Sequence, residues 1–391
     1  MRGILSIMMV LVVNVSLLAQ TKEDSPGWFD KIQIGGYLQV RYNGIFESNP
    51  QLECEQCDEN WGEQGNGFSF RRIRFKIKGQ ISPRVFFYFQ PDFAKSIGGS
   101  HHVGQLKDAY IDLGLDRLNE FRLRIGQSKV PFGYENMQSS SNRLPLDRND
   151  ALNSAVKDER DLGVFLYWAP TEKRDMIHGF RKAGLSGGDF GLFALGIYNG
   201  QTANQSDEND KFHLVTRFTY PLVLGKQVIE PGIQAYTGTY VVTSHHPEIE
   251  VDAQGYLDQR AALSFVLYPN PIGIQAEYNV GRGPEFDRYT NSVRVKHLQG
   301  GYATLSYYIE KGNQYFFPYF RIQYYDGGKK HENDARSYTV KEAEFGVEWH
   351  PFKNFELVAN YTLSDRRFED YANPVNTQRG GLMRIQAQVK F

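Results

Sequence analysis

The sequence predicts an all-β chain that forms a transmembrane antiparallel β-barrel. The 391 residues include 24 Tyr and 27 Phe, yet the mean hydropathy is −0.50. Apolar and polar residues alternate in segment after segment, and no long apolar run follows Leu18. A helical membrane protein could not be this polar. A barrel can, because only alternate side chains face the lipid and the others line a wet lumen.

The amino terminus has the organisation of a secretion signal. A positive start and a mostly apolar run to Leu18 are followed by the small residue Ala19 and then by polar residues. The run is shorter than the roughly 20 residues that a spanning helix needs, and its pattern is that of a signal peptide. We therefore expect a signal peptide over 1–19, a short periplasmic stub over 20–31 and an outer-membrane barrel over 32–391.

Period-two alternation predicts the strands. Every second residue from Met383 to Phe391 is apolar, and the residues between them are Arg, Gln or Lys. Residues 272–280, 320–325 and 85–93 alternate in a similar way. This period indicates strands with one apolar and one polar face. The aromatic last residue on such a strand is typical of outer-membrane barrels, and no segment of the chain indicates a helix.

The length of the chain sets the size of the barrel. At about ten residues per tilted strand, plus connections, the chain accommodates about 16 strands. Pro and Asn predict tight turns at residues 82–83, 268–271 and 350–354. Longer polar stretches predict external loops at residues 47–66, 199–210 and 326–337.

A row of basic residues follows Phe70. They occupy every second position, with Ile or Phe between them: Arg72, Arg74, Lys76 and Lys78. Because a basic side chain on the lipid face costs about 2–4 kcal/mol, this row is expected to face the lumen. Arg122 with Arg124, and Arg294 with Lys296, repeat the pattern.

Such rows predict a lumen that attracts anions, since the planar guanidinium binds phosphate or carboxylate well. The alternative is a weakly selective pore, in which acidic residues on facing strands neutralise the rows. The acidic residues expected to point inward are Asp92, Glu277, Glu344 and Glu348. The sequence leaves both interpretations open.

Four segments resemble the phosphate-selective porin O and P family: FSFRRIR (68–74), YFQPDF (88–93), LKDAYID (106–112) and RLRIGQSKVPFG (122–133). The resemblance covers the mature chain, and its specific motifs lie between Phe68 and Gly163. It implies a trimeric 16-stranded barrel with an arginine ladder and a third loop folded inward to narrow the pore.

The resemblance also implies which residues line this pore. The ladder positions are Arg72 and Arg74, with Arg122 and Arg124 beside them. The inward loop is expected over 134–161, with Lys129 at its entrance and Arg143 and Arg148 within it. Acidic residues outnumber basic ones in this loop.

Cys54 and Cys57 form a Cys-x-x-Cys in a long loop. In an exported protein a local disulfide is the expected state of such a pair. No second pair completes a metal site, and we expect no cofactor and no nucleic-acid partner.

The functional prediction is an outer-membrane porin for passive diffusion of small hydrophilic solutes, with anions such as phosphate as the expected solutes. The expected partners are those anions, outer-membrane lipid and two further copies in a homotrimer. Two alternatives remain: a non-specific, plugged or adhesive barrel without anion selectivity, and a barrel enzyme. We do not expect an enzyme, because no histidine lies in a recognisable Ser or Asp setting.

Overall fold

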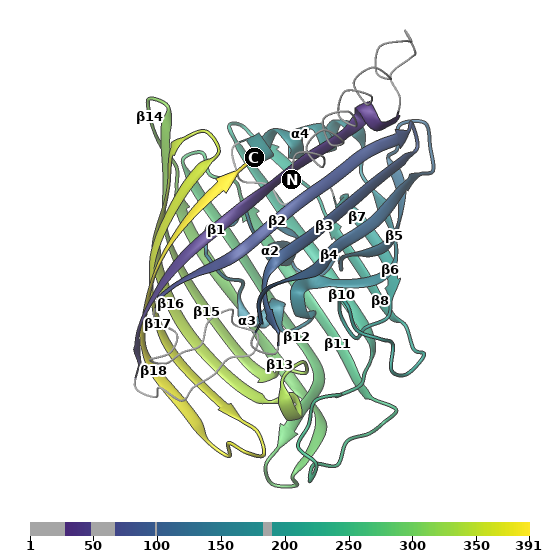
Figure 1. The fold of residues 1–391 in the computed structure, drawn as a ribbon, viewed down its shortest axis with the longest axis vertical. Coiled ribbons are helices and arrows are strands. Elements are labelled where there is room, and N and C mark those ends of the chain that lie inside the picture. The colour runs from purple at the N-terminus through teal and green to yellow at the C-terminus, as the bar shows by residue number, and fades with distance from the viewer. Residues whose placement is uncertain (1–27, 48–66, 98–99, 183–189) are drawn as a thin grey trace, which may run out of the picture.

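The computed structural model describes residues 28–47, 67–97, 100–182 and 190–391, which form a closed antiparallel β-barrel (Figure 1). The predicted signal peptide, most of the predicted stub, the first long loop and both cysteines, Cys54 and Cys57, lie outside the described residues.

The strands form one sheet whose ends meet. They are β1 (Ile32–Glu47), β2 (Gly67–Ser82), β3 (Val85–Ile97), β4 (Ser100–Gly114), β5 (Phe121–Lys129), β6 (Arg160–Trp168), β7 (Phe193–Tyr198), β8 (His213–Thr219), β9 (Leu222–Leu224), β10 (Gln227–Tyr240), β11 (Tyr256–Leu267), β12 (Ile272–Asp287), β13 (Ser292–Tyr307), β14 (Ile309–Lys311), β15 (Gln314–Gly328), β16 (Ser337–Phe352), β17 (Phe355–Glu369) and β18 (Asn376–Lys390). β8 and β9 pair in succession with β10, and β13 and β14 pair with β15, so the barrel has 16 strands. The predicted strand number is confirmed.

The barrel closes where β1 pairs with β18. The Gly36 nitrogen donates to the Phe391 oxygen at 2.9 Å, and the Phe391 nitrogen donates to the Gly36 oxygen at 3.1 Å. The Phe391 ring packs against Phe75 on β2, with ring centroids 5.8 Å apart. Closure leaves the sheet without an open edge. A bilayer requires this, because unpaired backbone groups at an edge would find no hydrogen-bond partner in lipid.

Gly36 is expected to be essential for tight closure. A Cβ at this position would lie 2.3 Å from the Arg74 backbone oxygen and 2.6 Å from Cζ of Phe391. Gly36→Ala should therefore destabilise the barrel by about 1–3 kcal/mol, seen as a lower temperature for the shift from folded to unfolded mobility on a denaturing gel. Gly179→Ala is the control, because a Cβ there would meet nothing within 4 Å. Equal transition temperatures for the two variants would contradict this account of closure.

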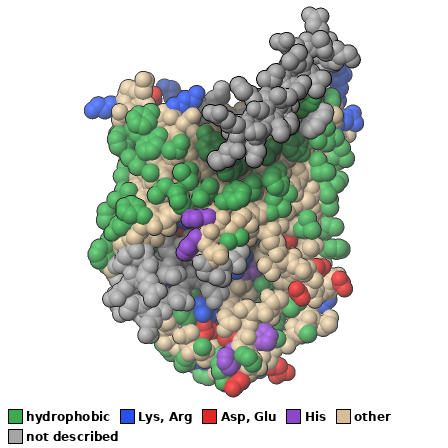
Figure 2. Space-filling view, viewed as in Figure 1, with side chains coloured by type: hydrophobic (Ala, Val, Ile, Leu, Met, Phe, Trp, Pro, Cys, Tyr) green, Lys and Arg blue, Asp and Glu red, His purple; other side chains and the backbone are tan. Residues whose placement is uncertain are grey.

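Exposure alternates along the strands as predicted. On β18, Arg384 and Gln386 are buried inside the barrel, whereas Met383 and Ile385 are exposed on the outer wall. Figure 2 shows hydrophobic side chains spread over the visible wall, with charged side chains mainly towards the two ends. None of the described helices is long and apolar enough to cross a membrane.

The connections differ between the two ends of the barrel. The predicted tight turns lie at the end where β1 begins and β18 finishes, which we call the turn end. Apart from the segment between β6 and β7, the longer connections lie at the opposite, loop end (Figure 1). In outer-membrane barrels short turns face the periplasm and long loops face the exterior.

The turn end carries a helix, α4 (Thr171–Lys182), although the sequence was expected to contain none. Pro170 precedes the helix, and its carbonyl accepts from the Arg174 nitrogen at 3.0 Å. Glu120 accepts from the Thr171 nitrogen at 2.8 Å. The prediction was wrong because this segment has too few apolar residues to show a helical period, and its first turn is fixed by Pro170 and Glu120.

Residues 130–159, between β5 and β6, fold into the lumen; we call this segment the inner loop. It contains α2 (Tyr134–Met137), α3 (Asp150–Asn153) and the 3-10 helix η3 (Lys157–Glu159). Its apolar residues Phe132 and Leu152 belong to the buried core that includes Tyr236 and Tyr325 of the barrel wall. The predicted inward loop is confirmed, but Arg160 and Asp161 belong to β6.

Residues 329–336, predicted as a polar external loop, are largely buried. Lys329, Glu332 and Asp334 are fully enclosed, and the segment includes the 3-10 helix η4 (Asn333–Ala335). The loop is buried because its charges find partners: Lys329 contacts Asp150 of the inner loop at 2.5 Å. The other short helix, η1 (Trp28–Lys31), precedes β1.

Candidate pore and its charged lining

Two cavities occupy the lumen, and the side chain of Arg74 lines both. The loop-side cavity has a volume of about 240 Å³ and the turn-side cavity about 660 Å³. Basic residues outnumber acidic ones along the loop-side cavity. Its basic lining is Arg71, Arg72, Arg74, Lys95, Lys107, Arg143, Arg148, Lys157, Arg321, Arg366 and Arg384, and its acidic lining is Asp92, Asp147, Asp150, Asp158, Glu159, Glu342 and Glu344.

The predicted row on β2 faces the lumen and runs from one cavity to the other. Arg72 lines the loop-side cavity, whereas Lys76 and Lys78 line the turn-side cavity. Arg74 is neutralised: its Nε lies 2.6 Å from Oδ2 of Asp92. The net charge that a solute meets therefore differs from one position of the row to the next.

The charge of Arg72 is balanced by no carboxylate among the described residues. Its Nη1 donates to Oε1 of Gln39 at 2.8 Å, and its side chain is 4 % exposed. Within the described part of the chain, Arg72 pairs with no carboxylate and its Nε has no hydrogen-bond partner. A buried guanidinium with an unused N–H can accept an anion without losing an existing bond.

Arg71 reaches the lumen through a β-bulge. In the pairing of β1 with β2, Gln39 opposes Arg72 and Val40 opposes Phe70, so Arg71 has no partner residue. The extra residue turns the Arg71 side chain inward, where its Nη2 lies 3.2 Å from Oδ1 of Asp147. Strict alternation would place Arg71 outside, so no pattern in the sequence indicates this contact.

Asp147 fixes the inner loop to the wall. Besides Arg71, it binds Arg41 of β1 at 3.1 Å and Arg384 of β18. Burial raises the pKa of Asp147, but Arg41, Arg384 and Arg71 lower it, and the result lies well below the usual range. The carboxylate is thus charged at every physiological pH and balances part of this arginine cluster.

Arg143 and Arg148, both in the inner loop, differ in charge balance. Arg143 donates to the backbone oxygens of Pro145 at 3.0 Å and Leu146 at 2.6 Å. Among the described residues it has no carboxylate partner, and its Nη1 has no hydrogen-bond partner. Arg148 is instead paired with Glu159 at 2.6 Å. Arg143, like Arg72, therefore offers an unused N–H to the loop-side cavity.

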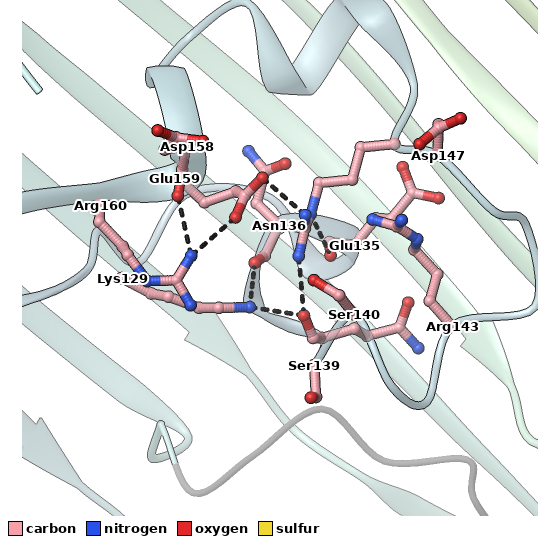
Figure 3. A network of polar contacts seen from close by, with 12 residues as sticks. Lys129, Glu135, Asn136, Ser139, Ser140, Arg143, Asp147, Asp158, Glu159 and Arg160 are labelled. Carbon is pink, nitrogen blue, oxygen red and sulfur yellow. Dashed lines mark hydrogen bonds and ion pairs between the residues drawn. The ribbon is translucent and has the colours of Figure 1, made fainter. Parts of the chain in front are cut away.

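Lys129 was predicted as a cation at the entrance of the inner loop, and it holds that loop together. Its Nζ donates to the backbone oxygens of Asn136 at 2.7 Å and Gln138 at 2.5 Å (Figure 3). The side chain is 5 % exposed. Two of its three donors are therefore committed to the backbone that follows α2, although Lys129 also borders the turn-side cavity.

Arg122 and Arg124 line the turn-side cavity and share one acid. Asp112 Oδ1 lies 2.7 Å from Nε of Arg124, and Asp112 Oδ2 lies 3.7 Å from Nη1 of Arg122. The Arg124 guanidinium also lies 3.8 Å from the ring centroid of Tyr110. This pair contributes less net charge than the sequence pattern indicates.

Arg294 and Lys296 do not form a third lumen row. Arg294 is exposed and donates to side-chain hydroxyls of its own hairpin, including Thr290 at 3.1 Å. Lys296 pairs with Asp287 at 3.3 Å. The pattern was misleading because these residues lie beside the β12–β13 hairpin turn at the loop end, away from both cavities.

The inward acidic residues mostly serve structural contacts. Glu277 accepts from the backbone nitrogens of Tyr134 and Glu135. Glu344 pairs with Arg384 at 3.0 Å, and Glu348 contacts His350 at 2.5 Å. Neutralisation of the basic rows is therefore partial, with Asp92 and Asp112 as its main sources on β3 and β4.

One carboxylate–histidine group could in principle hold a metal ion. Among the described residues, ligand atoms of Glu348, His350 and Glu356 lie within 4.8 Å of one another. Nζ of Lys390 already lies 3.4 Å from Glu356. This ammonium group supplies the positive charge that a metal would bring.

Several lining residues were not identified from the sequence. They come from strands around the barrel: Arg71, Lys107, Arg160 and Arg366. Alternation places Arg321 and Arg384 on polar faces. No local pattern shows that Arg321 meets Glu135 at 3.1 Å, or that Arg160 meets Asp108 at 2.9 Å.

His331 links the 329–336 loop to the inner loop. Its Nε2 accepts from the Lys157 nitrogen at 3.2 Å, and its Nδ1 lies 3.1 Å from Oη of Tyr240. Burial, followed by the neighbouring Lys330 and Lys157, lowers the pKa of His331 well below its usual value. Protonation of His331 would turn Nε2 into a donor that faces the Lys157 N–H, so this hydrogen bond would be lost.

Acidification should therefore loosen this contact. The pKa of His331 is lower in the docked loop than in the unfolded chain. Docking is therefore complete above the unfolded pKa of about 6.5 and weakens as the pH falls below that value. We expect current fluctuations in a planar bilayer to increase between about pH 6.5 and pH 4.5, and His331→Gln to reduce this response. His297→Gln, at an exposed position, is the control. The same pH profile in wild type and His331→Gln would refute the role of His331.

Solved structures with a similar fold are outer-membrane channels. The barrel resembles the outer membrane channel DcaP of Acinetobacter baumannii, with a TM-score of 0.55, 11% identity and coverage of 92% of this chain and 97% of that chain. It also resembles OmpF of Salmonella typhi, solved in complex with daunomycin, with a TM-score of 0.56, 14% identity and coverage of 92% and 97%. At these identities the likeness concerns the fold alone.

The sequence itself identifies the family. No curated protein matches the chain. The family model of phosphate-selective porin O and P matches residues 46–391, nearly the whole chain. With a closed 16-strand barrel and the fold of outer-membrane channels, the protein is a bacterial outer-membrane protein that belongs to the phosphate-selective porin O and P family.

Proposed function

We propose that the protein is a passive channel for small hydrophilic anions, phosphate among them. The observation that carries this proposal is the charge of the turn-side cavity. Its described lining contains two carboxylates, Asp108 and Asp112, against a larger basic set: Arg74, Lys76, Lys78, Arg84, Arg122, Arg124, Lys129, Arg160, Arg174 and Lys390. A cleft lined mainly by one sign of charge concentrates the opposite ion.

The loop-side cavity supports the same proposal. Arg72 and Arg143 both line the loop-side cavity, and each has a buried N–H without a hydrogen-bond partner among the described residues. Two guanidinium groups suit the several oxygens of a phosphate or carboxylate. An anion that is held there displaces no ion pair, so entry costs little.

The β2 row gives such an anion a route between the cavities. Alternate residues on a strand are about 6.6 Å apart, so Arg72, Arg74, Lys76 and Lys78 form a series of closely spaced positions. Conduction requires sites that are favourable enough to enter and weak enough to leave. The pairing of Arg74 with Asp92 weakens anion binding at the middle of the row.

We also infer a homotrimer in outer-membrane lipid, as the family resemblance implies, and a channel instead of an enzyme. Chemical cross-linking of the protein in native outer membranes tests the assembly. A ladder that stops at three copies is the expected result, and a ladder that stops at one copy would exclude the trimer.

The first test of function is the reversal potential in a planar bilayer under a KCl gradient. We expect the reversal potential to have the sign of the chloride equilibrium potential, because the basic lining concentrates anions. Added phosphate should then reduce the chloride current by occupying the site between Arg72 and Arg143. A neutral or cation-preferring channel would refute the proposal, and an anion preference without phosphate block would restrict it to general anions.

A further inference from the structure

The two cavities differ in their aromatic content. The described lining of the loop-side cavity contains no aromatic residue. The turn-side cavity is bordered by aromatic side chains from three strands and two connecting or terminal positions: Tyr37, Phe86, Tyr88, Tyr110, Phe190 and Phe391. A site for inorganic anions alone gains little from such rings.

Two of these rings stack face to face inside the barrel. Tyr88 of β3 and Tyr110 of β4 are register partners, and their rings stack at 5.2 Å with an interplanar angle of 11°. Neither hydroxyl has a hydrogen-bond partner among the described residues. We call these two residues the tyrosine pair.

A basic residue lies on each side of the tyrosine pair. Lys78 of β2 is the register partner of Tyr88. On the other side, the Arg124 guanidinium covers the Tyr110 ring at 3.8 Å. Gly126 opposes Tyr110 on β5, and a Cβ there would lie 2.9 Å from the Tyr110 Cα, so the glycine leaves room for this arrangement.

We propose that the turn-side cavity is a binding subsite for aryl anions, meaning an aromatic ring that carries carboxylate or sulfonate groups. The inference rests on the proposed anion channel and names a solute class for it. The ring of the anion stacks on the face of Tyr88 that is turned away from Tyr110, because Arg124 covers the second face of Tyr110. Its acidic groups reach Lys78 and Lys76. The tyrosine hydroxyls remain available as donors.

The size and chemistry of the cavity fit this class. A volume of about 660 Å³ is within the range of about 300–1,000 Å³ that is usual for small-molecule sites. Aromatic stacking contributes beyond the burial of apolar area. A ring-bearing anion gains this term in addition to the charge attraction that every anion receives, so the cavity distinguishes the two kinds of anion.

The test compares two dianions that differ by a ring. Benzene-1,3-disulfonate and propane-1,3-disulfonate carry the same charge at all working pH values, and only the first can stack. Each is titrated against the chloride current of the full-length channel in a planar bilayer. We expect half-block by the aryl dianion at a concentration about 3- to 10-fold lower.

Variants then locate the ring contact. Tyr88→Leu with Tyr110→Leu should abolish the difference between the two dianions. Phe89→Leu, next to Tyr88 but exposed on the outer wall, should leave the difference unchanged. Lys78→Gln should weaken block by both dianions to a similar extent, because it removes charge and no ring.

The outcomes separate this inference from the proposed function. Equal block by the two dianions in a channel that prefers chloride would overturn the aryl subsite and leave the anion channel standing. A ring advantage that survives the double tyrosine change would also overturn it. A channel with no preference for chloride would overturn the proposed function and the subsite with it.

Discussion

Replacing Arg72 and Arg143 together by Gln should lower the chloride-to-potassium permeability ratio by about fivefold to tenfold. Two charges in contact interact by about 1 kcal/mol even in water, and salt screens part of this attraction in a wet lumen. Both residues line the loop-side cavity without a carboxylate partner in the described chain, so their loss leaves no acid uncompensated. The reversal potential under a KCl gradient measures the change.

The choice of residues follows from the pairing of the basic row. Changing Arg74 would leave the buried Asp92 without its guanidinium partner, and the effect would mix selectivity with destabilisation. Arg282→Gln is the matched control, because Arg282 is exposed at a site away from the lumen cavities. A permeability ratio that stays at the wild-type value in the double variant would remove both residues from the selective part of the pore.

The same double variant should lose phosphate block. The two guanidinium groups provide the unused N–H groups that a phosphate would occupy. Phosphate added to a chloride-conducting wild-type channel is expected to reduce the current, and the variant should conduct at nearly the same level with or without it. Block that persists in the variant would place the phosphate site elsewhere, with the turn-side cavity as the next position to test.

Asp147→Asn should loosen the inner loop and strengthen anion preference. The change leaves Arg41, Arg71 and Arg384 facing an amide in place of a carboxylate. Breaking a buried ion pair from one side costs about 3–5 kcal/mol, and less here because the Asp147 side chain is 24% exposed. The remaining positive charge should attract anions more strongly.

Single-channel recording distinguishes the two effects. A loosened loop should give a larger and noisier conductance, and the added net charge should shift the reversal potential further towards that of chloride. Asp365→Asn is the control, since Asp365 pairs with Arg379 and both side chains are substantially exposed. Wild-type conductance and noise in Asp147→Asn would show that this aspartate does not hold the loop.

Local pattern alone determined the barrel. The alternation along β18 assigned Arg384 to the lumen and Met383 to the outer wall, because neighbouring side chains on a strand point to opposite faces. The same rule placed Arg72 and Arg74 inside. It failed at Arg71, where a bulge adds one residue to β2, and at α4, whose apolar residues are too few to reveal a helical period.

The sequence determined that a basic row lines a membrane barrel, since the cost of charge in lipid leaves such residues only one face. The tertiary structure decided which of these charges remain available. The charge of Arg72 stays unbalanced because its neighbour on β1 is Gln39, whereas Asp92 balances the charge of Arg74 and Lys129 is bound to the inner loop. Charge balance depends on contacts between residues that lie far apart in the chain, and no period in the sequence records them.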